Sequence, residues 1–294
     1  MAERRYYRVA GLTFSLFAEA GQWTLLTNYA PFGVSEADAD EHLFDLSVGT
    51  FAQPADATHL FTDSAEDLMP RIEVWRVPST GGWLFRMAPV RDAEECAALL
   101  VSPDFRQATL YIAQPAHARF AIDNATMLLF ALASAPLCTL ELHAAAVVRN
   151  DHAYLFLGTS GTGKSTHARL WQEAFPDAWL LNDDNPVLRV LPDGEVRVYG
   201  SPWSGKTPCY RPLSAPVRGI VQLRQAPANA MQRLRLPEAY AYMLSSSSGL
   251  KTRPEMMDAL YTTIVRVLDA VPVYLLDCLP DTDAARLCHD TINP

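Results

Sequence analysis

The stretch AYLFLGTSGTGKSTHARLWQEAF, from Ala153 to Phe175, decides the fold of the second half of this 294-residue chain. It opens with an apolar run, continues with a glycine-rich segment, and ends in a stretch that contains neither Pro nor Gly. A strand that delivers such a turn to the start of a helix surrounds phosphate oxygens with backbone N–H groups and the positive end of the helix dipole. The sequence therefore predicts a strand, a phosphate-binding loop and a helix in this order.

Two segments match the phosphate-loop pattern G-x-x-x-x-G-K-[ST]: GTSGTGKST, Gly158 to Thr166, and GSPWSGKTP, Gly200 to Pro208. The second match holds a proline and a tryptophan where small residues would let the backbone approach phosphate. Further prolines forbid a regular helix after it; they are Pro208, Pro212 and Pro216. We therefore predict that only the first match is a P-loop and that the second is an ordinary surface loop.

Within the first match, the residue types indicate individual roles. Lys164 is expected to reach the β- and γ-phosphates, and the hydroxyl of Ser165 is expected to ligate Mg²⁺. Gly161 and Gly163 allow a close approach of the backbone to phosphate. The predicted nucleotide-binding residues are Gly158, Thr159, Ser160, Gly161, Thr162, Gly163, Lys164, Ser165 and Thr166.

A pair of carboxylates, Asp183 and Asp184, ends the short apolar run in LLNDDNP, Leu180 to Pro186. Adjacent side chains of a strand point in different directions, so one aspartate can hold a metal while the other acts as a general base. We predict both as catalytic residues and Asp184 as a metal ligand, and leave open which one is the base. The alternative is a turn in which Asp184, Asn185 and Pro186 merely cap the strand.

The remaining sequence predicts two domains. Residues 1–120 are β-rich: Leu12 to Phe17 alternates as a half-buried strand, Ser79 to Gly82 is a hairpin turn, and Ala108 to Ala113 is another strand. A helix with Asp123 or Asn124 as its N-cap begins the second domain, residues 121–294. There, strands alternate with helices and with hairpins, which predicts an α/β fold of α+β character with a mixed sheet.

The composition of the chain limits the kinds of partner that the protein is expected to bind. The net charge of −9 and the pI near 5.2 argue against binding to nucleic acid or to an anionic membrane. The five cysteines include no C-x-x-C pair, which favours reduced thiols and a cytoplasmic protein. The N-terminus has no signal-peptide pattern. The most apolar segment, Met127 to Leu140, falls short of the ~20 residues of a membrane span and is predicted to be a buried helix.

The string LHAAAVVRNDHAYLFLGTSGTGKST, followed by LNDDNP, resembles the kinase core shared by HPr kinase/phosphorylase and ATP-dependent phosphoenolpyruvate carboxykinase. The whole chain is also similar to small bacterial HPr-kinase-like proteins that often carry a carboxykinase label, in which GSPWSGKTPCYR recurs. The resemblance implies a C-terminal P-loop kinase domain of this type over residues 121–294. The N-terminal module would then serve acceptor recognition or assembly.

The resemblance also implies site residues and cofactors. His143 would be a ligand of a second metal or a phosphate contact, although a histidine on an apolar strand is as often a plain core residue. Lys206 and Arg211 would bring positive charge to the transferring phosphoryl group. The implied cofactors are ATP and Mg²⁺, with room for a second divalent metal such as Mn²⁺. A homo-oligomer is implied as well, because HPr kinases form hexamers.

Three functions follow as hypotheses. The first is a kinase that transfers the γ-phosphoryl group of ATP to a hydroxyl, either a protein or peptide serine or a small molecule. For this kinase, pyrophosphate as donor and reverse phosphorolysis both stay open. The second is a phosphoenolpyruvate carboxykinase, and the third is a non-catalytic ATP sensor that signals through the N-terminal module.

Overall fold

The computed structural model describes residues 2–39, 42–63, 70–205, 207–249 and 254–294. It divides the chain into two compact units, Met1–Ala133 and Ser134–Pro294. The sequence placed this boundary after residue 120, and helix α2 (Ala118–Ser134) accounts for the difference. The helix packs into the first unit, where the ring of Phe130 meets that of Phe14 edge-on, with 6.1 Å between their centres. It also begins at Ala118, earlier than the predicted cap at Asp123 or Asn124.

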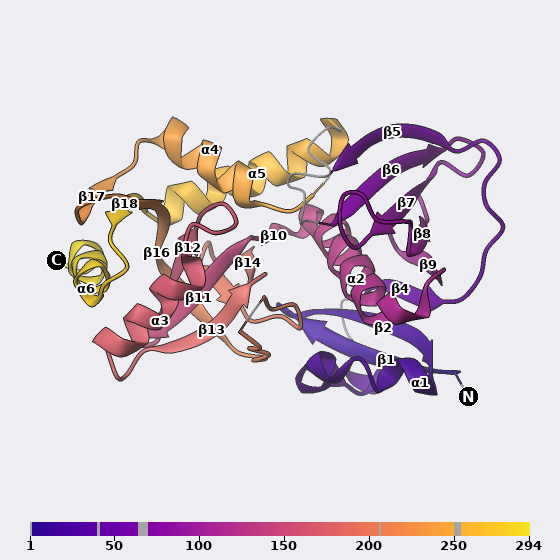
Figure 1. Ribbon diagram of the computed structural model, residues 1–294, viewed down its shortest axis with the longest axis horizontal. Coiled ribbons are helices and arrows are strands. Elements are labelled where there is room, and N and C mark those ends of the chain that lie inside the picture. Colours follow the sequence, from indigo (N-terminus) through magenta and orange to yellow (C-terminus); the bar gives the residue numbers. More distant parts are fainter. Residues whose placement is uncertain (1, 40–41, 64–69, 206, 250–253) are drawn as a thin grey trace. The chain divides into compact units, whose positions relative to one another are not determined.

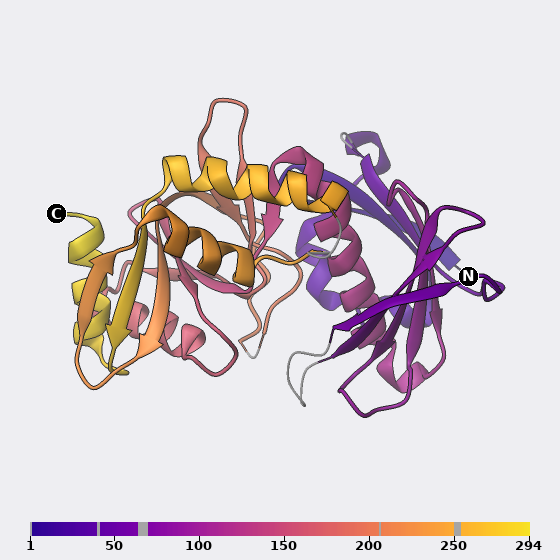
Figure 2. The ribbon, with the colours of Figure 1, turned by 90° about the horizontal axis from the view of Figure 1, so that it is seen from above.

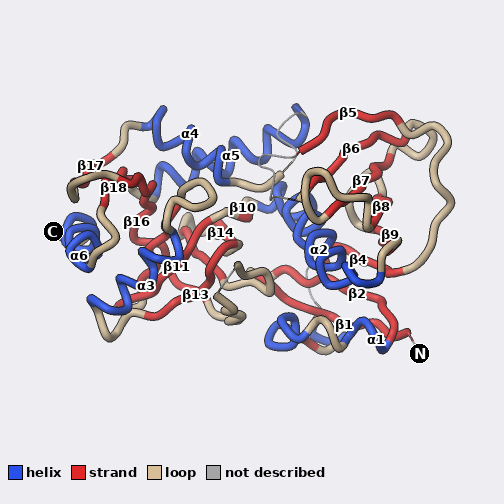
Figure 3. The backbone as a smooth tube through the Cα atoms, viewed as in Figure 1, coloured by secondary structure: helices blue, strands red, loops and turns tan. Residues whose placement is uncertain are grey.

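The first unit is built on a nine-stranded mixed sheet with the order β3-β1-β2-β4-β9-β8-β7-β6-β5. Helix α2 lies against it, and Figure 3 distinguishes this helix, in blue, from the red strands. The strands are β1 (Ala2–Val9), β2 (Leu12–Glu19), β3 (Gly33–Val34), β4 (His42–Val48), β5 (Thr58–Asp63), β6 (Arg71–Val77), β7 (Gly82–Ala88), β8 (Ala97–Val101) and β9 (Gln107–Ile112). The short helices are α1 (Ala20–Trp23) and the 3₁₀ turns Thr27–Phe32, Glu36–Asp38 and Pro115–His117.

The sequence predictions for this unit are largely confirmed. The turn at Ser79 to Gly82 joins β6 and β7 as an antiparallel hairpin, and β9 matches the predicted strand. Strand β2 differs in part, because Thr13 and Ser15 are buried on the face that was expected to be exposed, while Phe17 and Glu19 on the same face are exposed. The Ser15 hydroxyl donates a hydrogen bond to Asp45 on β4. Burial of a polar side chain costs little free energy when the side chain has a hydrogen-bond partner. The alternation of polar and apolar residues therefore did not reveal that Thr13 and Ser15 are buried.

The second unit contains a central sheet with the order β13-β11-β12-β16-β18-β17 and three antiparallel strands, β10-β14-β15, that join it at β16. Strand β16 serves both parts because its first residues pair with β15 and its later ones lie between β12 and β18. The strands are β10 (Thr139–Glu141), β11 (Ala144–Arg149), β12 (His152–Leu157), β13 (Trp179–Asp184), β14 (Val187–Val190), β15 (Val196–Tyr199), β16 (Ser214–Gln225), β17 (Ala230–Arg233) and β18 (Val273–Cys278).

Helices cover both faces of the central sheet (Figures 1 and 2). The alternation along β11 sends Ala144, Ala146 and Val148 to the side of α4 and α5, and the intervening residues to the side of α3 and α6. The helices are α3 (Lys164–Ala174), α4 (Leu236–Ser246), α5 (Pro254–Ala270) and α6 (Thr282–Ile292), with a 3₁₀ turn at Ala135–Leu137. The unit is therefore a layered fold with a mixed sheet, as predicted.

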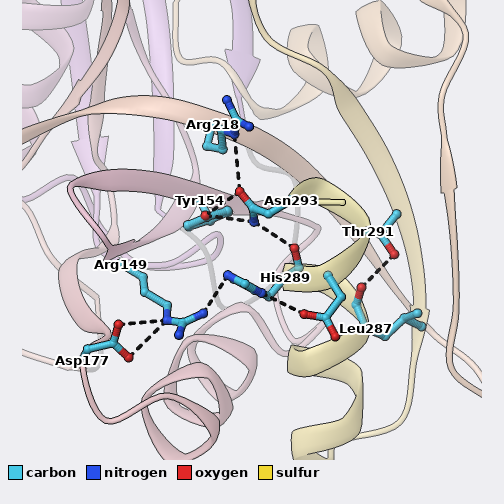
Figure 4. Close-up of polar contacts among 9 residues, drawn as sticks. Arg149, Tyr154, Asp177, Arg218, Leu287, His289, Thr291 and Asn293 are labelled. Atoms are coloured by element: carbon cyan, nitrogen blue, oxygen red, sulfur yellow. Dashed lines mark hydrogen bonds and ion pairs between the residues drawn. The ribbon is translucent and has the colours of Figure 1, made fainter.

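The C-terminal helix α6 is fixed to the sheet by a polar network as well as by apolar packing (Figure 4). Arg149 at the end of β11 donates to both carboxylate oxygens of Asp177, at 3.1 and 3.0 Å, and lies 2.6 Å from Nε2 of His289 on α6. Asn293 exchanges hydrogen bonds with the hydroxyl of Tyr154 on β12. These contacts hold the layer that also contains α3.

One helical stretch among the described residues, Pro115–Leu137, has the length and composition of a membrane span, with a mean hydropathy of 1.4 over its apolar window. Half of that window is buried inside the protein. Ile122 and Leu129, for example, are 1% and 0% exposed. The stretch is longer than the sequence predicted, but its burial is that of a core helix, and the fold is compatible with a soluble protein.

Candidate functional site

The polar residues of interest in the second unit meet at one edge of the central sheet. Strand β11 runs antiparallel to both of its neighbours, so β12 and β13 are parallel and end at the same edge. In the register of the sheet, Ala144 lies between Leu157, the last residue of β12, and Asp184, the last residue of β13. The phosphate-loop segment, the aspartate pair and His143 therefore leave the sheet side by side.

The loop after β12 has the predicted arrangement of strand, glycine-rich loop and helix, since α3 begins at Lys164. Gly161 and Gly163 have φ angles of +79° and +107°, which side chains disfavour. These conformations turn the chain sharply enough for the helix to begin directly at the lysine. The N-terminus of α3, with its unpaired N–H groups, therefore faces the edge where the aspartates lie.

Lys164 is 8% exposed and bends back over its own loop. Its ammonium group donates to the carbonyl oxygens of Gly158, at 2.9 Å, and Thr159, at 3.4 Å. Burial lowers the pKa of this lysine, while the carboxylates of Asp184 and Asp183 act in the opposite direction. The cation is thus held near both aspartates by weak acceptors that an anion can replace.

The two aspartates have different surroundings. Asp183 is 2% exposed, and its Oδ2 atom has no hydrogen-bond partner among the described residues. In contrast, Oδ1 of Asp184 lies 3.1 Å from Nε2 of His143, and its Oδ2 accepts a hydrogen bond from Asn185. The φ angle of Asp184 is +135°, a strained value for a residue with a side chain. The pair therefore offers one unengaged oxygen and one carboxylate that is held in place.

The alternative in which the aspartates only cap the turn finds no support in these contacts. The side chain that closes the turn belongs to Asn182, whose Oδ1 accepts a hydrogen bond from the backbone N–H of Asn185 at 2.9 Å. The Asn182 amide also donates to the carbonyl oxygen of Trp203 at 3.0 Å. Asp184 is not needed for this cap.

His143 lies beside Asp184, with about a third of its side chain exposed. Its backbone N–H donates to the carbonyl oxygen of Ser246 at the end of α4. The described residues hold no group of three or more His, Cys, Asp or Glu side chains that could bind a metal ion. The assignment of His143 and Asp184 as metal ligands stays a prediction.

Glu141, at the end of β10, was missed by the sequence analysis. It is 1% exposed, and neither of its carboxyl oxygens makes a hydrogen bond of good geometry with a described residue. Burial raises the pKa of Glu141 well above its ordinary value, and the nearby Asp184 carboxylate raises it further, while the Ser248 side chain lowers it. A signal existed in the sequence: Glu141 precedes His143 by two residues in an otherwise apolar run.

The second pattern match, Gly200 to Pro208, contains no helix among its described residues and leads into β16. It is not an ordinary surface loop, however, because Ser201 and Trp203 are 0% and 3% exposed. Its Gly205 N–H donates to the carbonyl oxygen of Asp183 at 2.5 Å, and the Ser204 hydroxyl donates to the same oxygen at 3.2 Å. The loop therefore holds the backbone of the aspartate pair.

This contact leaves little space for a side chain at Gly205. A Cβ atom there would lie 3.0 Å from Cβ of Asp184 and 3.1 Å from the carbonyl oxygen of Asp183. The φ angle of Gly205 is not positive, so space and not backbone conformation requires glycine.

The two basic residues of this loop that were predicted to act at the phosphoryl group are Lys206 and Arg211. Lys206 lies outside the described residues. The guanidinium of Arg211 stacks over the ring of Trp179, with 5.2 Å to its centre, at the beginning of β13. The aspartates end that strand five residues later, roughly 16 Å along it. The structure does not bring Arg211 to the aspartates, because the loop runs back along β13 towards its start and the cation is held there by the indole.

Comparison with protein-family models finds no match to the chain, and comparison with curated proteins finds no significant relative. The interpretation of the site depends on its residues and their geometry.

Proposed function

We propose that the chain is a nucleotide-dependent phosphotransferase that moves the γ-phosphoryl group of ATP to a hydroxyl, and that its second unit is a P-loop kinase domain of the HPr kinase and phosphoenolpyruvate carboxykinase type. The observation that carries the proposal is the convergence of Lys164, Asp183 and Asp184 at the start of α3. Phosphoryl transfer needs phosphate positioning, charge neutralisation and a group that accepts the hydroxyl proton. These residues supply a means for each.

The residues at this edge fit Mg²⁺. Hard oxygen donors suit this ion, which is commonly held by one or two carboxylates together with phosphate oxygens and water. Ser165 and Asp184 would hold it, with His143 orienting the Asp184 carboxylate from 3.1 Å. When bound, the ion neutralises charge on the phosphates. The unengaged oxygen of the buried Asp183 is consistent with a site that awaits further partners.

The contacts also divide the roles of the aspartates. Asp184 is engaged by His143 and Asn185, which suits a fixed metal ligand. Oδ2 of the buried Asp183 has no hydrogen-bond partner among the described residues, so this carboxylate is less engaged than that of Asp184 and suits a base that accepts the proton of the acceptor hydroxyl. Lys164 would exchange its loop carbonyls for phosphate oxygens, and the N–H groups of the loop would surround the same anion.

The test is a label-transfer assay with the purified full chain, γ-labelled ATP and Mg²⁺, against cell lysate separated into protein and small-molecule pools. We expect label in one of these pools above the level of a hydrolysis control. Bound ATP without any transferred label would overturn the proposal in favour of a nucleotide sensor. A parallel reaction with oxaloacetate that yields phosphoenolpyruvate would identify carboxykinase chemistry instead.

A further inference from the structure

A cavity of about 270 Å³ opens beside the first turn of α3 and shares Ser165 and Thr166 with the phosphate loop. It lies within the second unit, between α3, β13 and Thr207. Its polar lining residues are Ser165, Thr166, Arg169, Gln172, Asp183 and Thr207.

The cavity has chemically different ends. Residues 165, 169 and 172 share one face of α3 by their helical spacing. Helix α3 runs antiparallel to β12 and β13, so the start of the helix lies by Asp183, near the end of β13. Arg169 lies about 6 Å further along the helix than Ser165, on the side of Leu180. Asp183 therefore lines one end of the cavity, and Arg169 lines the other.

Arg169 is available to a ligand. Its only described ion pair is with Glu173, one turn along the helix, at 3.6 Å, where the two side chains are 69% and 52% exposed. Exposed pairs of this kind contribute little to stability, because water screens the attraction. A carboxylate that enters the cavity can therefore compete for the guanidinium, which binds such groups in a two-pronged geometry.

We propose that this cavity, the acceptor cavity, binds the phosphoryl acceptor, and that the acceptor is a small hydroxy acid. Its hydroxyl would lie at the end formed by Asp183 and Ser165, and its carboxylate at Arg169. The size agrees, since the volume lies near the lower end of small-molecule sites, which span about 300–1,000 Å³. The inference rests on the proposed function and names its substrate class.

The transfer step balances with the groups present. The acceptor oxygen forms a bond to the γ-phosphorus while the bond from that phosphorus to the β–γ bridging oxygen breaks. The hydroxyl proton passes to the carboxylate of Asp183, and ADP leaves with the bridging electron pair.

Binding is the first test, because it does not require turnover. The full chain, with ADP and Mg²⁺ present, is titrated with glycerate and L-serine and with glycerol and serinol, which lack the carboxylate, and binding is followed by calorimetry or ligand-observed NMR. We expect an acid to bind at least tenfold more tightly than its counterpart without the carboxylate. We expect Arg169→Gln to remove this preference and Glu173→Gln, the matched control on the other half of the surface pair, to retain it. Equal binding with and without the carboxylate, or an unchanged preference in Arg169→Gln, overturns the inference.

Transfer separates this inference from the proposed function. With a hydroxy acid as acceptor, Arg169→Gln should raise KM at least tenfold and change kcat little. If label enters only a protein band and Arg169→Gln does not alter the kinetics, the proposal of a small-acid acceptor is wrong, but the proposed phosphotransferase activity stands. ATP binding with no transfer to any acceptor overturns both.

Discussion

At the scale of single residues, the site consists of charged groups whose burial is only partly compensated. Lys164 donates to two backbone carbonyls, and the Oδ2 atom of Asp183 has no partner among the described residues. A buried polar group without a full set of partners costs free energy. The folded protein therefore holds these groups ready for a charged ligand, and substitutions should affect binding and chemistry more than folding.

Replacement of Lys164 by alanine should weaken ATP binding by at least about tenfold to a hundredfold, because a charge-assisted hydrogen bond contributes about 1.5–3 kcal/mol. The fold should persist, since the substitution also removes a cation whose burial is costly. Equilibrium binding of ATP measures the first effect and far-UV circular dichroism the second. ATP affinity equal to that of the unaltered chain would remove the phosphate-loop assignment.

Replacement of either aspartate by asparagine should leave most of the ATP affinity but lower the transfer rate by about 10²–10⁴-fold, the usual contribution of a general base. Single-turnover transfer and ATP binding are measured on Asp183→Asn and Asp184→Asn in parallel. Full activity of both variants would reduce the pair to structural residues.

At the scale of elements, helix α3 is attached to the sheet through a buried histidine. His167 is 3% exposed; the indole Nε1–H of Trp171 donates to its Nε2 at 3.2 Å, and the ring of Phe156 on β12 packs against it. Burial lowers the pKa of His167 from 6.5 to about 4, because the interior disfavours the imidazolium. The neutral ring thus helps to position the helix that begins at Lys164.

This histidine makes stability depend on pH. Between pH 6.5 and about 4 the unfolded chain binds more protons at this site than the folded one, so the free energy of unfolding should fall as pH is lowered through this window. The loss attributable to His167 is at most about 3 kcal/mol. Denaturant unfolding at pH 7.5 and 4.5 measures it, and His167→Gln should reduce the difference. The exposed His152→Gln is the control, and an equal reduction there would contradict this explanation.

The sequence predicted elements that depend on local pattern and missed features that depend on pairing between distant segments. The loop from Gly158 to Lys164 and the helix that begins at Lys164 follow from adjacent residues, and the structure contains both. Helix α4, which begins just before Pro237, was missed. The burial of Glu141 and the displacement of Arg211 towards Trp179 arise from contacts between strands and loops far apart in the chain. No local pattern encodes such contacts.

At the scale of the whole molecule, the chain consists of two units, each with its own sheet and buried side chains. Every residue proposed to bind nucleotide, metal or acceptor lies between Glu141 and Arg211, within the second unit. The first unit contributes a sheet and helix α2 but none of these residues.

Residues 134–294 alone should therefore bind ATP with an affinity within a few-fold of that of the full chain. The fragment is checked for folding by circular dichroism and titrated with ATP beside the full chain. A folded fragment that fails to bind ATP would show that the first unit supplies part of the nucleotide site.

The two segments that match the phosphate-loop pattern require glycine for different physical reasons, at Gly163 in the first and at Gly205 in the second. The difference is between the handedness of the backbone conformation and the space for a side chain. At Gly163 the obstacle to alanine is the positive φ angle, and a Cβ atom would meet nothing within 4 Å. A D-alanine introduced there by chemical synthesis suits that backbone and should preserve the loop. At Gly205 the obstacle is space, because a Cβ atom would lie 3.0 Å from Cβ of Asp184 and 3.1 Å from the carbonyl oxygen of Asp183, so an L-alanine that the backbone itself would accept still has to displace the backbone or side chain of the aspartate pair. Two matches to the same pattern thus encode one constraint of chirality and one of space.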